Sequence, residues 1–331
     1  MPVSRWRHGL VIGKFRPPHA GHDLLINTAL DQVEHLDVIV CADAGDPIPA
    51  DRRAAWLAEL YPTAAVRVVE TTVYDADDSV LWATLVRGWL GAAPEVVFTS
   101  EPYGDAFARA LGCVHVAVDP ARVRVPISAS RILADPLGHL EYLAPCVRAA
   151  FVARVVLAGA ESTGKTTLAR ALAAHYDTVW VPEYGRLFCD GMLPHGYTWE
   201  PADFEHIAQA QQCLEDQLAR KARRVLICDT DAFATWLWQQ RYLGRETPAL
   251  RTLASANRPA HYLLAGDEIA WEDDGTRDRR GERHAFQARI WAALEADGRP
   301  YTVLRGPLGE RLAHAVAAID ALLAGPLRVG A

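Results

Sequence analysis

The sequence predicts an α/β protein with two domains, each built on a doubly wound parallel sheet. Short apolar runs alternate with stretches of helical periodicity along the whole chain, which is the pattern of β-α-β units. The 331 residues suffice for two domains of ordinary size, and a glycine-rich loop of phosphate-binding type begins only at Gly159. We therefore expect a Rossmann-like domain over residues 1–150 and a P-loop domain over residues 151–331.

Composition and charge restrict the class of protein. Half of the residues are hydrophobic and 23% are charged, which is typical of a globular protein, and the net charge of −7 disfavours a nucleic-acid or membrane-surface role. The six cysteines form no C-x-x-C pair, so we expect reduced thiols in a cytoplasmic protein rather than a zinc or redox site. The first apolar run ends at Lys14, too early for a signal peptide, and no run is long enough to span a membrane.

The first strand is expected at residues 10–12 and leads into the string G-K-F-R-P-P-H-A-G-H. This string places His19 and His22 at a helix N-terminus, where two imidazoles and the helix dipole form a phosphate site. Apolar residues recur at helical spacing from Leu25 to Leu36, which predicts the helix that follows. The residues expected to act at this turn are Lys14, His19 and His22 as catalytic groups and Gly13, Phe15 and Gly21 as ATP contacts.

Further strands at 37–40, 66–69, 95–98 and 114–118 alternate with helices at 52–60, 80–90 and 105–111. Ligands of such sheets bind at the carboxyl ends of strands, so Ser100, just beyond the strand at 95–98, is a candidate substrate contact. Trp82 lies on the helix at 80–90, where it either stacks on a flat ring of a ligand or belongs to the core.

A second motif of the first half, I-S-A-S-R-I, occupies residues 127–132. It resembles the I-S-x-[ST]-x-x-[RK] motif of nucleotidyltransferases that move an adenylyl group onto a phosphate. The resemblance implies that Ser128, Ser130 and Arg131 contact the phosphates of ATP. Leu133 stands at the final basic position of the motif, and Arg131 lies about 200° away from it round a helix. Either Arg131 or Arg124 could substitute for that base. Arg131 could equally be a surface charge with no role in binding.

The second half begins with a P-loop, G-A-E-S-T-G-K-T, between an apolar run and a helical stretch. Its glycines let backbone N–H groups surround phosphate oxygens, Lys165 neutralises the outer phosphates, and the Thr166 hydroxyl holds Mg²⁺. The residues expected to bind ATP here are Gly159, Glu161, Ser162, Thr163, Gly164, Lys165, Thr166 and Thr167.

Two later strands end in polar residues. The strand at 179–182 precedes Glu183, Tyr184 and Arg186, which suit an acceptor with hydroxyls and a ring, although Glu183 and Arg186 alternatively form a local ion pair. The strand at 224–228 ends in Asp229 and Asp231, as in a Walker B strand. We expect Asp229 to take part in binding Mg²⁺, and either aspartate to accept the proton of an attacking hydroxyl.

A segment dense in both charges follows at residues 271–283. An arginine-bearing lid over the phosphates fits it, because phosphoryl transfer needs positive charge and exclusion of water. Arg277, Arg280 and Arg283 are the candidate lid residues, and a plain solvated loop is the alternative. Two more strands, at 261–265 and 301–304, and helices at 284–296 and 308–323 complete the domain.

The order and spacing of these motifs resemble the bifunctional nicotinamide-nucleotide adenylyltransferase / ribosylnicotinamide kinase family (NadR type). The match extends through T-S-E, E-Y-G-R, I-C-D-T-D, W-x-x-D-G-x-R and H-A-F-Q. The resemblance implies that the second domain phosphorylates nicotinamide riboside to nicotinamide mononucleotide (NMN). It implies that the first domain joins NMN to the adenylyl group of ATP, giving NAD and pyrophosphate. Catalysis would rest on His19, His22, Lys14 and Ser128 with Mg²⁺, and Trp82 would stack on the pyridine ring.

The resemblance also leaves alternatives. Some members of the family carry an N-terminal helix-turn-helix and repress genes of NAD metabolism, but too few residues precede the first strand here for such a domain, so we expect no nucleic-acid partner. A first domain that has lost catalysis and only senses NAD or ATP is a second interpretation, motivated by Leu133. A nucleotidyltransferase and kinase pair for another nucleoside or phosphate acceptor is the third. A homo-oligomer is compatible with each of them.

Overall fold

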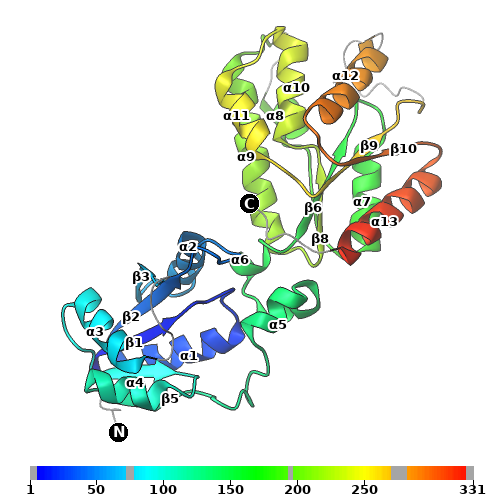
Figure 1. Ribbon diagram of the computed structural model, residues 1–331. Helices are drawn as coiled ribbons and strands as arrows, with labels where there is room; N and C mark the ends of the chain where they lie inside the picture. Colours follow the sequence, from blue (N-terminus) through cyan, green and yellow to red (C-terminus); the bar gives the residue numbers. More distant parts are fainter. Residues whose placement is uncertain (1–5, 72–77, 193–196, 270–281, 326–331) are drawn as a thin grey trace. The chain divides into compact units, whose positions relative to one another are not determined.

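The computed structural model describes residues 6–71, 78–192, 197–269 and 282–325 (Figure 1). The chain divides into two compact units, Met1–Val147 and Arg148–Ala331, and each is described by itself. Each unit contains a sheet of five parallel strands, so the predicted fold class is confirmed.

The sheet of the first unit has the strand order β3-β2-β1-β4-β5. Its strands are β1 (Trp6–Gly13), β2 (Val33–Ala42), β3 (Ala65–Glu70), β4 (Val96–Thr99) and β5 (Val114–Ala117). The helices are α1 (Ala20–Leu30), α2 (Ala50–Leu60), α3 (Ser79–Leu90), α4 (Gly104–Leu111) and α5 (Ala129–Ala134), followed by the 3₁₀ turn η1 (Leu137–Tyr142) and α6 (Pro145–Arg148). Alternate strand residues enter two cores: Val11 packs with α1 and α2, and Leu10 packs with α3 and α4.

The strand order reverses at β1, which lies between β2 and β4. Parallel pairing places Val11 opposite Phe98, so the carboxyl ends of β1 and β4 are neighbours. The histidine turn after β1 and the Thr99–Glu101 segment at the end of β4 therefore meet at the point where open α/β sheets bind ligands.

The helix predicted to run to Leu36 is shorter than expected. α1 ends at Leu30, and β2 begins at Val33. Val33 and Leu36 are nevertheless buried in the same core as Leu25 of α1. The apolar spacing reflects this common core and not a continuous helix.

The sheet of the second unit has the order β10-β9-β6-β8-β7. Its strands are β6 (Ala153–Ala158), β7 (Trp180–Val181), β8 (Val225–Asp229), β9 (His261–Ala265) and β10 (Tyr301–Leu304). The helices are α7 (Lys165–His175), α8 (Tyr184–Met192), α9 (Pro201–Ala219), α10 (Ala232–Leu243), α11 (Pro248–Ala256), α12 (Arg283–Ala296) and α13 (Leu308–Ala324). Figure 1 shows α7 and α13 beside each other, and Phe233 of α10 and Phe286 of α12 pack on the other face with Val156 and Leu226 of the sheet.

A buried carboxylic acid lies in the core of the second unit. Glu215 of α9 is 0% exposed; its Oε2 lies 3.4 Å from Nη1 of Arg154, and its Oε1 has no hydrogen-bond partner. Burial, and then the nearby Asp231, raises the pKa of Glu215 from 4.5 to about 8. The pKa of Glu215 is higher in the folded than in the unfolded chain. The contribution of this group to the stability of the fold is therefore fully present below about pH 4.5 and is lost as the pH rises through about 8.

Glu215→Gln is therefore expected to stabilise the second unit at alkaline pH. The amide carries no charge to bury, and Arg154 keeps Asp216 as a partner at 2.6 Å. We expect a gain of about 1–3 kcal/mol at about pH 8.5 and little change at about pH 5. Thermal unfolding across this range measures it, with the exposed Glu310→Gln of α13 as control. An equal shift at both pH values would contradict the assignment of the raised pKa to Glu215.

Within the described residues, no helix is long and apolar enough to cross a membrane. All six cysteines are free thiols.

Two candidate nucleotide sites

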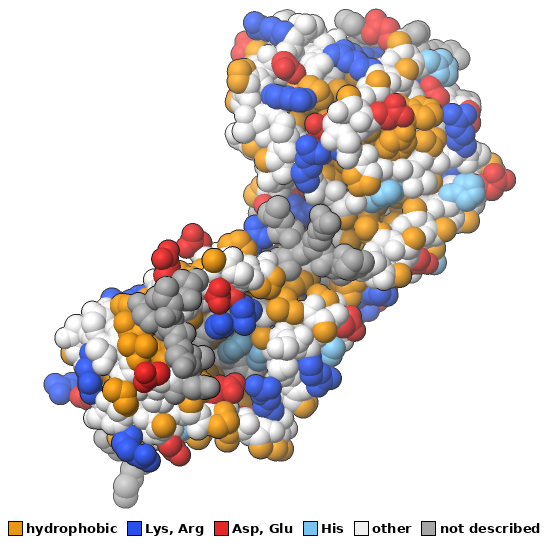
Figure 2. Space-filling view, in the orientation of Figure 1, with side chains coloured by type: hydrophobic (Ala, Val, Ile, Leu, Met, Phe, Trp, Pro, Cys, Tyr) orange, Lys and Arg blue, Asp and Glu red, His pale blue; other side chains and the backbone are white. Residues whose placement is uncertain are grey.

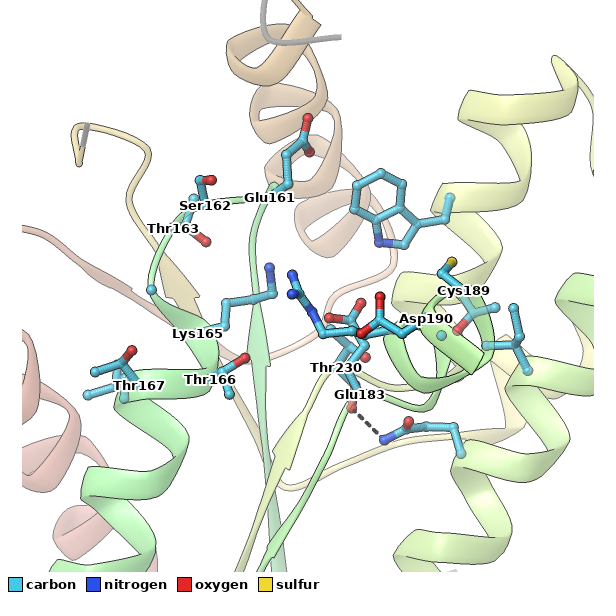
Figure 3. A pocket seen from close by; sticks show the side chains of 18 of the residues that line it. Glu161, Ser162, Thr163, Lys165, Thr166, Thr167, Glu183, Cys189, Asp190 and Thr230 are labelled. Carbon is cyan, nitrogen blue, oxygen red and sulfur yellow. Dashed lines mark hydrogen bonds between the residues drawn. The ribbon is translucent and has the colours of Figure 1, made fainter. Parts of the chain in front are cut away.

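The P-loop of the second unit joins the central strand β6 to α7. Gly159 has a φ of 143°, and a Cβ there would lie 3.0 Å from the carbonyl oxygen of Ala265, so the position requires glycine. Ser162 and Gly164 also have positive φ, at 57° and 78°. These turns make the loop concave, and its residues line a cavity of about 400 Å³ (Figure 3). The predicted phosphate contacts that line it are Glu161, Ser162, Thr163, Gly164, Lys165, Thr166 and Thr167.

Lys165 is the first residue of α7 and points into this cavity, opposite the carboxylates of Glu183 and Asp190 (Figure 3). Its Nζ donates hydrogen bonds to the carbonyl oxygens of Gly159 and Ala160, at 3.0 and 2.9 Å. The ammonium group is thus held over the loop by backbone acceptors. A bound phosphate would take the same donors, with stronger charge-assisted bonds.

Thr166 and Asp229 form the pair expected to hold Mg²⁺. The Thr166 hydroxyl donates to Oδ2 of Asp229 at 2.5 Å, while Oδ1 of Asp229 is buried without a hydrogen-bond partner. Burial raises the pKa of the Asp229 carboxyl, and Lys165 opposes that shift. An unsatisfied buried oxygen beside a hydroxyl fits a hard cation, which would favour the ionised carboxylate. No cluster of three or more His, Cys, Asp or Glu side chains exists in the described part of the chain, so phosphate and water oxygens would complete the shell.

Asp231 occupies a different environment from Asp229. Its carboxylate is 0% exposed, accepts from the backbone N–H of Ala234 at 2.9 Å as the N-cap of α10, and accepts from the Tyr262 hydroxyl at 2.5 Å. It does not line the cavity. The prediction that Asp231 acts as a proton acceptor does not fit this position, because both carboxylate oxygens have structural partners in the core.

Residues far from the P-loop in sequence hold its backbone in place. The backbone N–H of Ala160 donates to Oε1 of Gln287 at 2.8 Å, and Arg311 donates to the carbonyl oxygen of Thr163 at 2.8 Å. Arg311 and Gln287 are 2% and 6% exposed. Sequence reasoning missed both, because a polar residue on a long amphipathic helix carries no sign that it points inward. We refer to Arg241, Arg283, Gln287 and Arg311 as the loop supports.

The contacts of the other two loop supports, Arg283 and Arg241, differ from what the sequence predicted for Arg283 and Glu161. Arg283, predicted as a lid residue over phosphate, is 5% exposed and donates to the carbonyl oxygens of Ile269 and Ser162 at 2.8 and 3.1 Å. Arg241 forms a bidentate ion pair with Glu161 at 2.8 and 3.0 Å. The Glu161 side chain is therefore engaged by Arg241, which leaves the backbone N–H of Glu161 for the predicted contact with phosphate. Arg277 and Arg280 lie outside the described residues.

The wall of the cavity opposite the P-loop carries most of the residues predicted to bind the acceptor substrate. Glu183, which directly precedes α8, and Arg186, Cys189 and Asp190 of α8 line this wall. Aromatic side chains close it, with Trp238 and Tyr242 stacked at 5.9 Å between ring centroids; the aromatic lining residues are Trp199, Phe204, Trp238 and Tyr242. Tyr184 is not among the lining residues: its hydroxyl lies 3.2 Å from Nε2 of His206 and its backbone N–H donates to Gln211. The prediction of substrate contact therefore does not fit Tyr184.

The first unit carries the second candidate site, at the turn after β1. His19 is the N-cap of α1, and its Nδ1 accepts from the backbone N–H of Gly21 at 3.0 Å, which leaves the ring proton on Nε2. The His19 and His22 rings lie 3.9 Å apart between centroids. A Cβ on Gly21 would lie 2.9 Å from the His19 ring, so glycine is needed for this close packing. Phe15 is 2% exposed and its ring centroid lies 4.9 Å from that of His22, so its side chain packs against the histidine instead of contacting phosphate as predicted.

Both imidazoles are neutral in the free protein near pH 7. Burial, and then the positive charge of Arg122, lowers the pKa of His19 to about 4. Burial, then His19 and then Arg122, lowers the pKa of His22 well below its ordinary value. The pair therefore offers N–H donors at neutral pH and not two full charges.

A buried guanidinium fixes the first part of the histidine turn. Arg53 of α2 is 0% exposed and donates to the carbonyl oxygens of Lys14 and Cys41 and, at 2.6 Å, to Asp46. The turn is thereby tied to the end of β2. The Lys14 side chain remains half exposed and lies 3.8 Å from Asp43.

A cavity of about 240 Å³ opens beside Lys14. Trp82 lines it and packs edge-on against Trp89, with ring centroids 6.2 Å apart, so one part of the indole belongs to the core and another faces the cavity. The remaining lining residues are Ile12, Gly13, Cys41, Ser79, Tyr103 and Phe107. Ser100 is partly buried and does not line this cavity.

The I-S-A-S helix, α5, begins at the N-cap Ser128, whose hydroxyl oxygen accepts from the backbone N–H of Arg131 at 3.4 Å. Ser130 and Arg131 are exposed. The guanidinium of Arg131 donates to the carbonyl oxygen of Pro126 at 3.0 Å. Arg131 is thus tied to its own loop, and this contact does not favour it as the substitute for the base missing at Leu133.

Comparisons with known proteins identify the family. A family model described as an AAA domain matches residues 154–311. The trifunctional NAD biosynthesis/regulator protein NadR of Escherichia coli K12 is 29% identical over 323 residues, covering 89% of this chain and 78% of that protein. NadR of Salmonella typhimurium LT2 is 30% identical over 308 residues, covering 84% of this chain and 74% of that protein. The chain belongs to the NadR family.

Solved structures share the fold of this chain, and one further relative matches part of it. A crystal structure of an NadR protein in complex with NR has a TM-score of 0.81 at 21% identity and covers 99% of both chains. A second, in complex with NAD and AMP-PNP, has a TM-score of 0.76 at 19% identity and covers 98% of both chains. A nicotinamide-nucleotide adenylyltransferase of Pyrobaculum neutrophilum is 30% identical over 135 residues, covering 38% of this chain and 74% of that protein. The chain is thus an NadR-like enzyme of NAD biosynthesis.

Proposed function

We propose that the second unit phosphorylates nicotinamide riboside with ATP, and that the first unit transfers the adenylyl group of a second ATP to the resulting NMN, giving NAD and pyrophosphate. The observation that carries this proposal is the presence of two separate phosphate turns, Gly159–Thr166 and Lys14–His22, each at the carboxyl end of a central strand. NadR proteins crystallised with NR and with NAD and AMP-PNP support the choice of ligands.

The acceptor end of the kinase cavity suits nicotinamide riboside by its chemistry. The pyridinium ring of this nucleoside is flat and carries a positive charge. Aromatic side chains such as Trp238 and Tyr242 attract such a ring, and Glu183 and Asp190 provide negative charge and acceptors for ribose hydroxyls. The 5′-hydroxyl would give its proton to a carboxylate of the cavity wall, and its oxygen would attack the γ-phosphorus as the bond to the β-phosphate oxygen breaks, with ADP as the leaving group. Lys165 would neutralise the charge that develops on the phosphoryl oxygens.

ATP is the co-substrate of both reactions, and Mg²⁺ is the implied metal. Thr166 and Asp229 would hold the ion in the kinase half, where it would neutralise phosphate charge. In the other half, the 5′-phosphate of NMN would attack the α-phosphorus of ATP and expel pyrophosphate. His19, His22 and Lys14 would position the phosphates there, and Trp82 would lie against the pyridine ring in the adjoining cavity.

A second candidate function is favoured by one position. Leu133 stands where related nucleotidyltransferases carry a base, and Arg131 is bonded to Pro126. On this reading the first unit binds NAD or ATP and does not turn over, while the kinase remains active.

Chromatography of the products formed from nicotinamide riboside, ATP and Mg²⁺ decides between these functions. We expect NAD and pyrophosphate to accumulate, with NMN as a transient. If NMN alone accumulates, the sensor interpretation replaces adenylyl transfer. If nicotinamide riboside is unchanged while another nucleoside of a panel is phosphorylated, the acceptor assignment is wrong.

A further inference from the structure

The loop between β5 and α5 is a preformed turn that presents an arginine. The carboxylate of Asp119 accepts from the backbone N–H groups of Val123 at 2.9 Å and of Val125 at 3.1 Å, and the backbone N–H of Arg122 donates to the carbonyl oxygen of Asp119 at 2.8 Å. Asp119 and Arg122 both have positive φ, at 47° and 51°. The backbone conformation at Arg122 is therefore set by the loop's own hydrogen bonds, without a ligand.

This loop packs against the histidine turn. Gly21 lies between His19 and His22 in the sequence, and Cγ1 of Val125 lies 4.0 Å from the position that a Cβ on Gly21 would take. The Arg122 guanidinium lies 3.2 Å from Oε1 of Glu101, which follows β4. Because β4 pairs with β1, the guanidinium lies where the T-S-E segment meets the histidines. Its charge contributes to the lowered pKa of both His19 and His22, as expected of a nearby cation.

Arg122 can readily exchange its ion pair with Glu101 for a contact with a bound ligand. Both side chains are about half exposed, at 48% and 46%, and such surface pairs are weak. A guanidinium binds phosphate oxygens with two parallel hydrogen bonds, which are stronger than a single exposed contact to a carboxylate. A triphosphate bound at the histidine turn would therefore compete well for Arg122.

We propose that Arg122 is the phosphate-binding cation of the first nucleotide site, and that it replaces the base absent at Leu133. Glu101 holds the guanidinium beside the site until ATP binds. The proposal rests on ATP binding at the histidine turn, as in the proposed function. It assigns the role to neither Arg131, which is bonded to Pro126, nor Arg124.

The test compares Arg122→Ala and Arg122→Ala/Leu133→Arg with the parent protein, all in full-length chains that also carry Lys165→Ala to weaken the kinase site. Isothermal titration with ATP and with pyrophosphate measures binding, and adenylyl transfer is assayed with NMN supplied. We expect Arg122→Ala to weaken ATP binding and to raise KM for ATP by roughly 10- to 100-fold, and Leu133→Arg to recover at least part of this loss. The exposed Arg109→Ala of α4 removes one charge from the same unit and should bind ATP as the parent does.

Two results would overturn the proposal. One is ATP binding by Arg122→Ala within about twofold of the parent, since a charge-assisted bond is worth more than that. The other is a loss in Arg124→Ala that equals or exceeds the loss in Arg122→Ala. Failure of the proposed function gives a different pattern, because a parent protein that binds ATP but forms no NAD would still report the contribution of Arg122 through the titration. Thermal unfolding verifies that each variant is folded.

Discussion

Lys165→Ala is expected to lower kcat for phosphorylation of nicotinamide riboside by about 10³-fold, while adenylyl transfer from ATP to supplied NMN stays at the parent rate. The lysine ammonium is the cation of the P-loop, and its contacts with the Gly159 and Ala160 carbonyl oxygens hold it over the loop. Alanine leaves no positive charge to offset the charge that develops on the transferred phosphoryl group. The two reactions are measured separately, by ADP release with nicotinamide riboside and by NAD formation with NMN.

The control for Lys165→Ala is Lys221→Ala, which removes an exposed lysine after α9 and should leave both reactions unchanged. Melting temperatures of both variants separate loss of chemistry from loss of structure. If Lys165→Ala abolished NAD formation from NMN as well, the two units would not contain independent sites, and the assignment of one reaction to each unit would fail.

His22→Ala and His19→Asn are expected to lower the rate of adenylyl transfer by roughly 10²- to 10³-fold each, so that NMN accumulates when nicotinamide riboside is the starting substrate. Each change removes an imidazole donor from the phosphate turn. Asparagine is chosen for His19 because His19 caps α1 through Nδ1, and Asn is a good N-cap, whereas alanine would cost about 1 kcal/mol of helix stability. Time courses of NMN and NAD by chromatography give both rates in one experiment.

The exposed His35→Ala of β2 is the matched control for the histidine variants and should make NAD at the parent rate. The pH dependence of kcat/KM adds a second observation. Because the pKa of His19 lies at about 4 and that of His22 well below its ordinary value, we expect the pair to cause no inflection near the usual histidine pKa of about 6.5. If His22→Ala forms NAD at the parent rate, the histidine turn has no role in adenylyl transfer.

Much of this protein was predictable from short stretches of sequence. The alternation of strands and helices predicts two parallel α/β sheets, because strand and helix periodicities are local properties. Both phosphate turns are contiguous strings, so Lys165 and the His19–His22 pair were found without a structure. Leu133 was equally visible, since a departure from a motif is read from the same stretch.

The remaining site features depend on contacts between distant segments. Asp229 and Asp231 are two residues apart and chemically identical, yet one lies beside Thr166 and the other caps α10 in the core. Arg241 and Arg311 resemble surface arginines in the sequence, and only folding directs them to the P-loop. Arg283 was predicted near the phosphates, but only the structure shows that it supports the loop backbone.

Figure 2 shows lysine and arginine side chains scattered over the visible face of both units, so positive charge on the surface does not by itself distinguish a functional arginine. Arg122 is singled out by its loop, by Glu101 and by the neighbouring histidine turn. The sequence by itself determined the fold class and the two phosphate turns, because local backbone geometry encodes them. The tertiary structure alone decided which charged side chains support or complete the sites, because a charge acts on whatever lies within a few ångströms of it in space, at any distance along the chain.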